Sequence, residues 1–168
     1  MRKEFSECYD LVVYQIYPKS FKDSNGDGIG DLLGVISKLD YIKSLGANAI
    51  WLCPIFKSPQ CDNGYDVSDY RAIDPMYGSM ADFDRLLAVA HEKGIKIILD
   101  LVANHTSSEH EWFRQARSSR ENPYHDYYYW AEEPLTDWRS EFGGSAWEYN
   151  APTGEYYLHS FAVGQPDV

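Results

Sequence analysis

Three apolar runs separated by helical patterns organise the first hundred residues. The strand-like runs, rich in β-branched or aromatic residues, lie at 11–17, 49–52 and 95–102. Between them, apolar side chains recur at helical spacing over 32–45 and again after a capping-box start at 79–82. Gly46 and Gly94 follow these helices, where a chain that leaves a helix takes a positive φ. The pattern predicts the order β-α-β-α-β and a parallel sheet whose last strand is covered on both faces.

From residue 104 the pattern of apolar and polar residues changes, and it predicts polar loops and strands rich in aromatic residues. A short helix is expected at 109–117, and aromatic runs at 146–149 and 155–159 flank a Pro- and Gly-containing turn, which predicts a hairpin. We therefore divide the chain into an α/β part, residues 1–103, and a small β-rich insertion, residues 104–168. The aromatic run 127–130 is expected to pack this second part, although lining of a sugar cleft is the alternative.

Composition and charge narrow the classes of ligand. The 168 residues are 44% hydrophobic and carry a net charge of −11, which disfavours nucleic acid and anionic membrane surfaces as partners. The first eight residues lack the apolar core of a signal peptide or membrane anchor. Three cysteines, Cys8, Cys53 and Cys61, show no zinc-type spacing, so we expect reduced thiols and a cytoplasmic protein.

A loop rich in oxygen-bearing side chains follows the first strand. Asp23, Asn25, Asp27 and Asp31, with the Ile29 carbonyl, have the alternating spacing that suits Ca²⁺, although Mg²⁺ and a turn that binds no metal are alternatives. We expect a structural calcium site, because three acids this close would repel one another without a cation. The glycines of this loop do not form a dinucleotide fingerprint, so nucleotide binding is disfavoured.

Polar residues end the third strand. Asp100 could accept hydrogen bonds from sugar hydroxyls, and His105 could donate one, because the carboxyl ends of barrel strands face the active site. A buried loop-capping aspartate and a structural histidine are the alternatives for these two residues.

Five separated motifs appear in an order that resembles the α-amylase superfamily, in particular its oligo-1,6-glucosidase and α-glucosidase branch. They are the strand 13–18, the metal-like loop, the Asp-Asn-Gly-Tyr-Asp segment 62–66, the strand end 100–105, and Gln165-Pro166-Asp167. The resemblance implies the first three strands of a (β/α)₈ TIM barrel, with a B domain inserted after the third strand. It also implies that Asp62, Tyr65, Asp100 and His105 bind a terminal glucose. The segment Gln165-Pro166-Asp167 resembles a motif that favours α-1,6 links, with Val168 in place of the Leu of that motif.

The activity that the resemblance implies is retaining hydrolysis of α-linked gluco-oligosaccharides from the non-reducing end, by two carboxyl groups about 5–5.5 Å apart. Trehalose-6-phosphate hydrolases and sugar-rearranging transglycosidases share most of these motifs. None of the main catalytic acids of the family falls on a residue of this chain. We therefore expect a fragment of a monomeric parent enzyme, inactive and aggregation-prone alone, with a non-enzymatic relative as the competing class.

Overall fold

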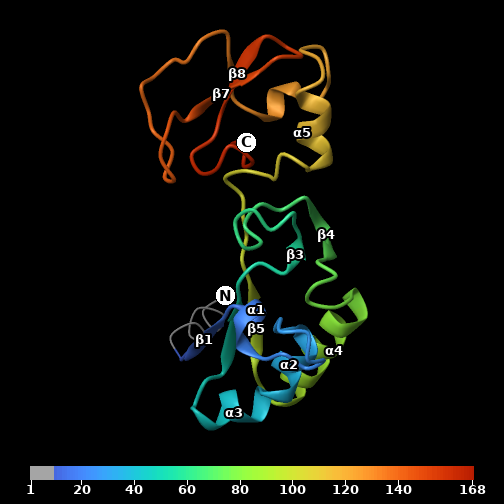
Figure 1. The fold of residues 1–168 in the computed structure, drawn as a ribbon. Coiled ribbons are helices and arrows are strands. Elements are labelled where there is room, and N and C mark those ends of the chain that lie inside the picture. Colours follow the sequence, from blue (N-terminus) through green and yellow to red (C-terminus); the bar gives the residue numbers. More distant parts are fainter. Residues whose placement is uncertain (1–9) are drawn as a thin grey trace, which may run out of the picture. The chain divides into compact units, whose positions relative to one another are not determined.

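The computed structural model describes residues 10–168, and the expectations for the first eight residues and for Cys8 lie outside them. The described chain forms two compact units (Figure 1). The first takes in the described residues up to Ile55 and Ala72–Asp100, and the second takes in Phe56–Arg71 and Leu101–Val168. Backbone hydrogen bonds such as that from Ser107 N–H to the Val67 carbonyl, 2.8 Å, hold 56–71 in the second unit. The domain boundary at 103/104 stays a prediction.

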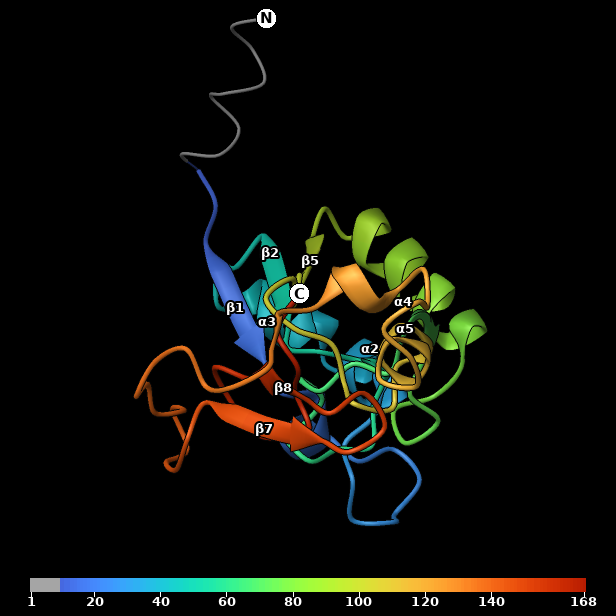
Figure 2. The ribbon, with the colours of Figure 1, turned by 90° about the horizontal axis from the view of Figure 1, so that it is seen from above.

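A three-stranded parallel sheet forms the centre of the first unit. Its strands are β1 (Val13–Ile16), β2 (Ala49–Leu52) and β5 (Lys96–Leu99), in the order β1-β2-β5. Figure 2 shows the three side by side. The register pairs Ile16 with Leu52 and Leu52 with Leu99, so equivalent positions form rows across the sheet. The predicted β-α-β-α-β order and the parallel pairing are confirmed.

The helices of the first unit are α1 (Pro18–Phe21), α2 (Leu32–Ser37), α3 (Leu39–Ser44) and α4 (Met80–Glu92). The single helix expected over 32–45 is wrong, since the backbone leaves helical geometry at Lys38, with φ −109° and ψ 4°. Neither Gly nor Pro marks this break, so the apolar spacing alone could not reveal it. The capping box of α4 is confirmed: Ser79 Oγ accepts the N–H of Asp82, and Asp82 accepts the N–H of Ser79.

One face of the sheet packs on the helices and the other is partly exposed. The core includes Ile16, Ile50 and Leu52, with helix residues such as Leu86. Successive strand residues point to opposite faces, and the opposite row contains Trp51 and Ile98, which are 36% and 38% exposed. Burial of the third strand on both faces is therefore not observed. Apolar side chains on this face of the sheet are therefore open to solvent.

The second unit contains two small sheets. One pairs β3 (Phe56–Lys57) with β4 (Asp69–Ile73), whose last two residues belong to the first unit, and the other has the order β6-β8-β7. The strands of the latter are β6 (Trp130–Ala131), β7 (Trp147–Asn150) and β8 (Glu155–Leu158), all antiparallel. The predicted hairpin is confirmed as β7–β8, and the short helix as α5 (Glu111–Ala116). The strands β3, β4 and β6 and the 3-10 turn η2 (His125–Tyr127) were not predicted.

Aromatic side chains build the core of the second unit. Phe113 of α5 stacks on Trp130 at 5.8 Å and contacts Tyr157 of β8 edge-on at 5.0 Å. Within the run 127–130, Tyr128 is buried against Phe113, while Tyr129 is exposed. Packing is thus confirmed for Tyr128 and Trp130 only.

Cys53 and Cys61 are both free thiols. The expected cytoplasmic location stays a prediction. Among residues 10–168, no helix is long and apolar enough to span a membrane.

Candidate sugar-binding site

A buried carboxylate shapes the loop that carries Asp62. Asp66 is fully buried and accepts hydrogen bonds from Ser58 Oγ, the Cys61 N–H and the Asp62 N–H, at 2.8, 2.9 and 3.0 Å. The loop turns through Gly64, whose φ of 98° is costly for any residue with a Cβ. Asp62 and Tyr65 therefore have a fixed backbone, and both side chains remain partly exposed.

Gln165 links two of the predicted sugar-binding residues. Its Nε2 donates to Asp62 Oδ2 at 2.9 Å and lies 3.0 Å from His105 Nε2. The Ala162 N–H donates to Gln165 Oε1 at 3.0 Å, which fixes the orientation of the amide. The Gln165 side chain is 0% exposed. Sequence reasoning named Gln165 only for a linkage motif, and nothing local in the sequence indicates this bridging contact.

His105 is a buried, neutral imidazole. Burial lowers its pKa below the ordinary value of 6.5, although the Tyr65 carbonyl and nearby carboxylates oppose this shift. A proton on Nε2 allows donation to the Tyr65 carbonyl at 3.2 Å and lets Nδ1 accept from Asn104 Nδ2 at 3.2 Å. With the proton on Nδ1 instead, Nε2 could accept a hydrogen bond from Gln165 Nε2, but the contacts with Tyr65 and Asn104 would no longer be hydrogen bonds. The ring packs on Phe161 at 5.1 Å.

The segment 159–168 brings Gln165 to this position. Asp167 is buried and accepts hydrogen bonds from Asn104 Nδ2 and from both the N–H and the hydroxyl of Ser160. The Val168 N–H donates to the Asn104 carbonyl at 3.0 Å. These contacts fix the segment against the Asn104–His105 backbone of the same unit. Asp167 is therefore a buried residue that stabilises the segment carrying Gln165.

Asp100 belongs to the first unit. It follows β5 directly, is partly exposed, and accepts a hydrogen bond from the indole N–H of Trp51 on β2. The structure thus brings Asp62, Tyr65 and His105 together in the second unit and places Asp100 at the end of the parallel sheet.

Backbone amides occupy most carboxylate oxygens of the metal-like loop. Asp23 accepts from the N–H groups of Asn25, Gly26 and Gly28, and hydrogen bonds led by that from Gly26 lower its pKa. The repulsion that was expected to demand a cation is therefore relieved without one. Asn25, Asp27, Ile29 and Asp31 border one hollow of about 190 Å³, whereas Asp23 does not. No group of three His, Cys, Asp or Glu side chains in residues 10–168 forms a metal-type cluster.

Asp31 has a structural role besides any role as a ligand. Its Oδ1 accepts the Gly34 N–H at 2.6 Å, which caps α2, and its Oδ2 accepts from Ser24. Desolvation raises the pKa of Asp31, but these hydrogen bonds outweigh it and leave the pKa below 3.8. Asp31 is therefore ionised at neutral pH.

Comparison with known proteins decides the family. Residues 15–168 match the family described as alpha amylase, catalytic domain. The chain belongs to the alpha-amylase family. An oligo-1,6-glucosidase of Heyndrickxia coagulans is 58% identical over 162 residues, which cover 94% of this chain and 29% of that protein.

Solved structures of alpha-amylase family members share the fold described above. Trehalose-6-phosphate hydrolase of Bacillus licheniformis is 58% identical with a TM-score of 0.91 over 94% of this chain. A MutB mutant solved with sucrose is 52% identical with the same TM-score and coverage. The chain spans 29% of the length of each of these two proteins.

Proposed function

We propose that this chain supplies the sugar-binding part of an exo-acting α-glucosidase of the oligo-1,6-glucosidase type. The observation that carries the proposal is the position of the buried Gln165 amide, which donates to Asp62 and lies 3.0 Å from the His105 ring, so that these two residues lie close together. Family membership and the 58% identity to an oligo-1,6-glucosidase support the substrate class. The (β/α)₈ barrel of the parent enzyme and its retaining mechanism belong to the same proposal.

The chemistry that these residues can perform is binding and orientation of a terminal glucose. The Asp62 carboxylate accepts hydrogen bonds from sugar hydroxyls, and its hold on Gln165 keeps it in one rotamer. The neutral His105 donates its one N–H to the Tyr65 carbonyl, which holds the backbone of Tyr65 without adding charge to the site. Tyr65 packs on the sugar ring, because C–H groups are attracted to the negative face of an aromatic ring. Asp100 lies in the first unit, and its role in sugar binding rests on the family resemblance alone.

Calorimetric titration of the chain with isomaltose tests the binding part of this proposal. We expect Asp62→Asn to weaken binding about tenfold, since a charged acceptor is replaced by a neutral one. Exposed Asp137, also in the second unit, offers the control Asp137→Asn, which should leave affinity unchanged. Equal affinities for the two variants would remove Asp62 from the proposed site.

Release of p-nitrophenol from p-nitrophenyl-α-glucoside tests the catalytic part. The family resemblance assigns neither the nucleophile nor the general acid to a residue of this chain, so we expect no release above the uncatalysed rate. Turnover by the chain that Asp62→Asn abolishes would show that its own residues perform the chemistry.

Trehalose 6-phosphate is the alternative substrate, favoured by the 58% identity to the trehalose-6-phosphate hydrolase. Comparing the affinity of the chain for trehalose 6-phosphate with its affinities for isomaltose, maltose and sucrose distinguishes the two proposed substrate classes. Preference for isomaltose supports the α-1,6 proposal, and preference for the phosphorylated disaccharide contradicts it.

We also propose a structural Ca²⁺ in the loop 23–31, with Mg²⁺ as the alternative. The four candidate ligands that border one hollow support this proposal. Calcium would add a cross-link within the loop and raise the thermal midpoint relative to a chelator-treated sample. Asp27→Asn should abolish that rise, and Asp84→Asn, an exposed change on α4, should leave it intact. A midpoint insensitive to both cations would contradict the site.

A further inference from the structure

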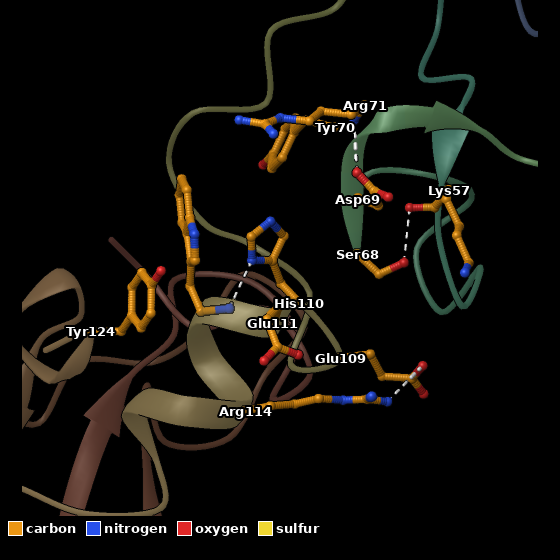
Figure 3. Close-up of a pocket in the computed structure, with 11 residues that line it drawn as sticks. Lys57, Ser68, Asp69, Tyr70, Arg71, Glu109, His110, Glu111, Arg114 and Tyr124 are labelled. Carbon is orange, nitrogen blue, oxygen red and sulfur yellow. Dashed lines mark hydrogen bonds and ion pairs between the residues drawn. The ribbon is translucent and has the colours of Figure 1, made fainter. Parts of the chain in front are cut away.

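A pocket lies in the second unit, and none of the four predicted sugar-binding residues lines it. Its volume is about 760 Å³, within the usual range for small-molecule sites. Figure 3 shows His110 in the middle of the lining residues, between Tyr70 and Glu111. Strand β4 and helix α5 supply most of the walls, with Lys57 on β3 and Tyr124 completing them.

The aromatic part of this pocket is held rigid but open. Trp112 contacts His110 edge-on at 4.7 Å and Tyr127 edge-on at 5.5 Å, and it is stacked with Tyr124 at 6.4 Å. Its side chain is nevertheless 39% exposed. A fixed, exposed indole offers contact area without a large loss of conformational entropy on binding.

His110 presents an unused hydrogen-bond donor. Its Nδ1 accepts the Trp112 N–H at 3.2 Å, so the proton of the neutral ring resides on Nε2. Burial lowers the pKa of His110 in spite of the nearby Asp69 and Glu111 carboxylates, which keeps the ring neutral at pH 7. Within the described residues, Nε2 has no hydrogen-bond partner and is not sealed from solvent.

The charges of the pocket balance. Three basic and three acidic side chains line it, namely Lys57, Arg71, Arg114, Asp69, Glu109 and Glu111. The guanidinium of Arg71 and the ammonium of Lys57 form no ion pair with any described residue, and Arg114 reaches Glu109 only at 3.7 Å. A charged ligand of either sign would be repelled by three of these six side chains. The hydroxyl groups of a neutral ligand can accept hydrogen bonds from the basic side chains and donate hydrogen bonds to the carboxylates.

We propose that this pocket is a second carbohydrate-binding site, which takes a neutral oligosaccharide with one ring on Trp112 and its hydroxyls on Arg71, Glu111 and His110. The site binds sugar without cleaving it. The proposal is independent of the Asp62 site: loss of binding there leaves the Trp112 pocket intact.

Nuclear magnetic resonance of the indole N–H signals gives a local test. The Trp112 signal is identified as the one missing from Trp112→Phe, and the chain is titrated with isomaltotriose and with maltotriose. We expect a saturating shift of the Trp112 signal with at least one of the sugars, in the wild-type chain and equally in Asp62→Asn. No saturating shift with either sugar, or its disappearance in Asp62→Asn, would overturn the proposal.

Affinity measurements on exposed variants complete the test without disturbing the core. Arg71→Ala should weaken the Trp112 response about tenfold, whereas Arg85→Ala, an exposed change on α4, should alter it less than about twofold. Equal responses in Arg71→Ala and Arg85→Ala would contradict the assigned pocket.

Discussion

At the residue scale, Gln165 determines the geometry of the candidate sugar-binding site. We expect Gln165→Ala to lower the free energy of unfolding by about 1–3 kcal/mol, because it removes a buried amide that donates to Asp62 and accepts the Ala162 N–H, and it leaves a space beside His105. Urea denaturation measures the loss. The matched control is Gln115→Ala, which removes only a surface pair with Glu111 worth about 0.2–0.5 kcal/mol. Similar losses in both variants would show that the bridge is unimportant.

The buried histidines predict the pH dependence of stability. Burial lowers the pKa values of His105 and His110 below 6.5, so the unfolded chain binds more protons than the folded chain as the pH falls through that value. The stability that these rings contribute is complete above pH 6.5 and is lost progressively in more acidic solution. Urea unfolding at pH 7.5 and 5.5 should show this loss, reduced in His105→Asn.

Exposed His91 of α4 provides the control for this measurement, since His91→Gln changes the number of histidines without removing a buried ring. A pH dependence that stays the same in His105→Asn as in the wild-type chain would contradict the assignment to His105.

At the element scale, the capping box of α4 is the local signal with the clearest energetic meaning. Ser79→Ala removes the acceptor of the Asp82 N–H and the hydroxyl that donates to the Asp82 carboxylate. We expect a loss of about 1 kcal/mol in the free energy of unfolding. Ser44→Ala at the end of α3 tests the same chemistry without a cap, and should cost less in the same denaturation experiment. A larger loss for Ser44→Ala would contradict the capping argument.

Elements with strong local signals were predictable from the sequence, and elements that depend on distant contacts were not. The strand at Ala49–Leu52, the cap at Ser79 and the β7–β8 turn each carry their own pattern. The two-residue strands β3 and β6 are too short for a periodic signal, and they exist because a partner strand lies beside them.

The candidate site follows the same division. The family motifs pointed to Asp62 and His105. The contribution of Gln165 depends on an approach across 103 residues that no spacing rule expresses.

At the scale of the whole molecule, the partly exposed sheet face predicts self-association. Trp51 and Ile98 are paired on that face, and apolar sheet surface is an aggregation hazard. We expect Ile98→Thr to raise the concentration at which light scattering appears, with little change in the far-ultraviolet circular dichroism spectrum. Val163→Thr is the control, because Val163 is also exposed but lies outside any strand. Equal improvement from both changes would show that general surface polarity, not this face, limits solubility.

The bridging position of Gln165 also sets an order of events in time. Asp62, His105 and Gln165 are separated by long stretches of chain. Contacts between residues that are far apart in the sequence form slowly, because closing the intervening chain into a loop costs entropy. During synthesis the ribosome delivers Asp62 first and Gln165 last among the three. The parallel sheet can pair as soon as β5 has emerged. The sugar-binding arrangement must wait for about another 66 residues, from Leu99 to Gln165, which at about 5–20 residues per second takes roughly 3–13 seconds.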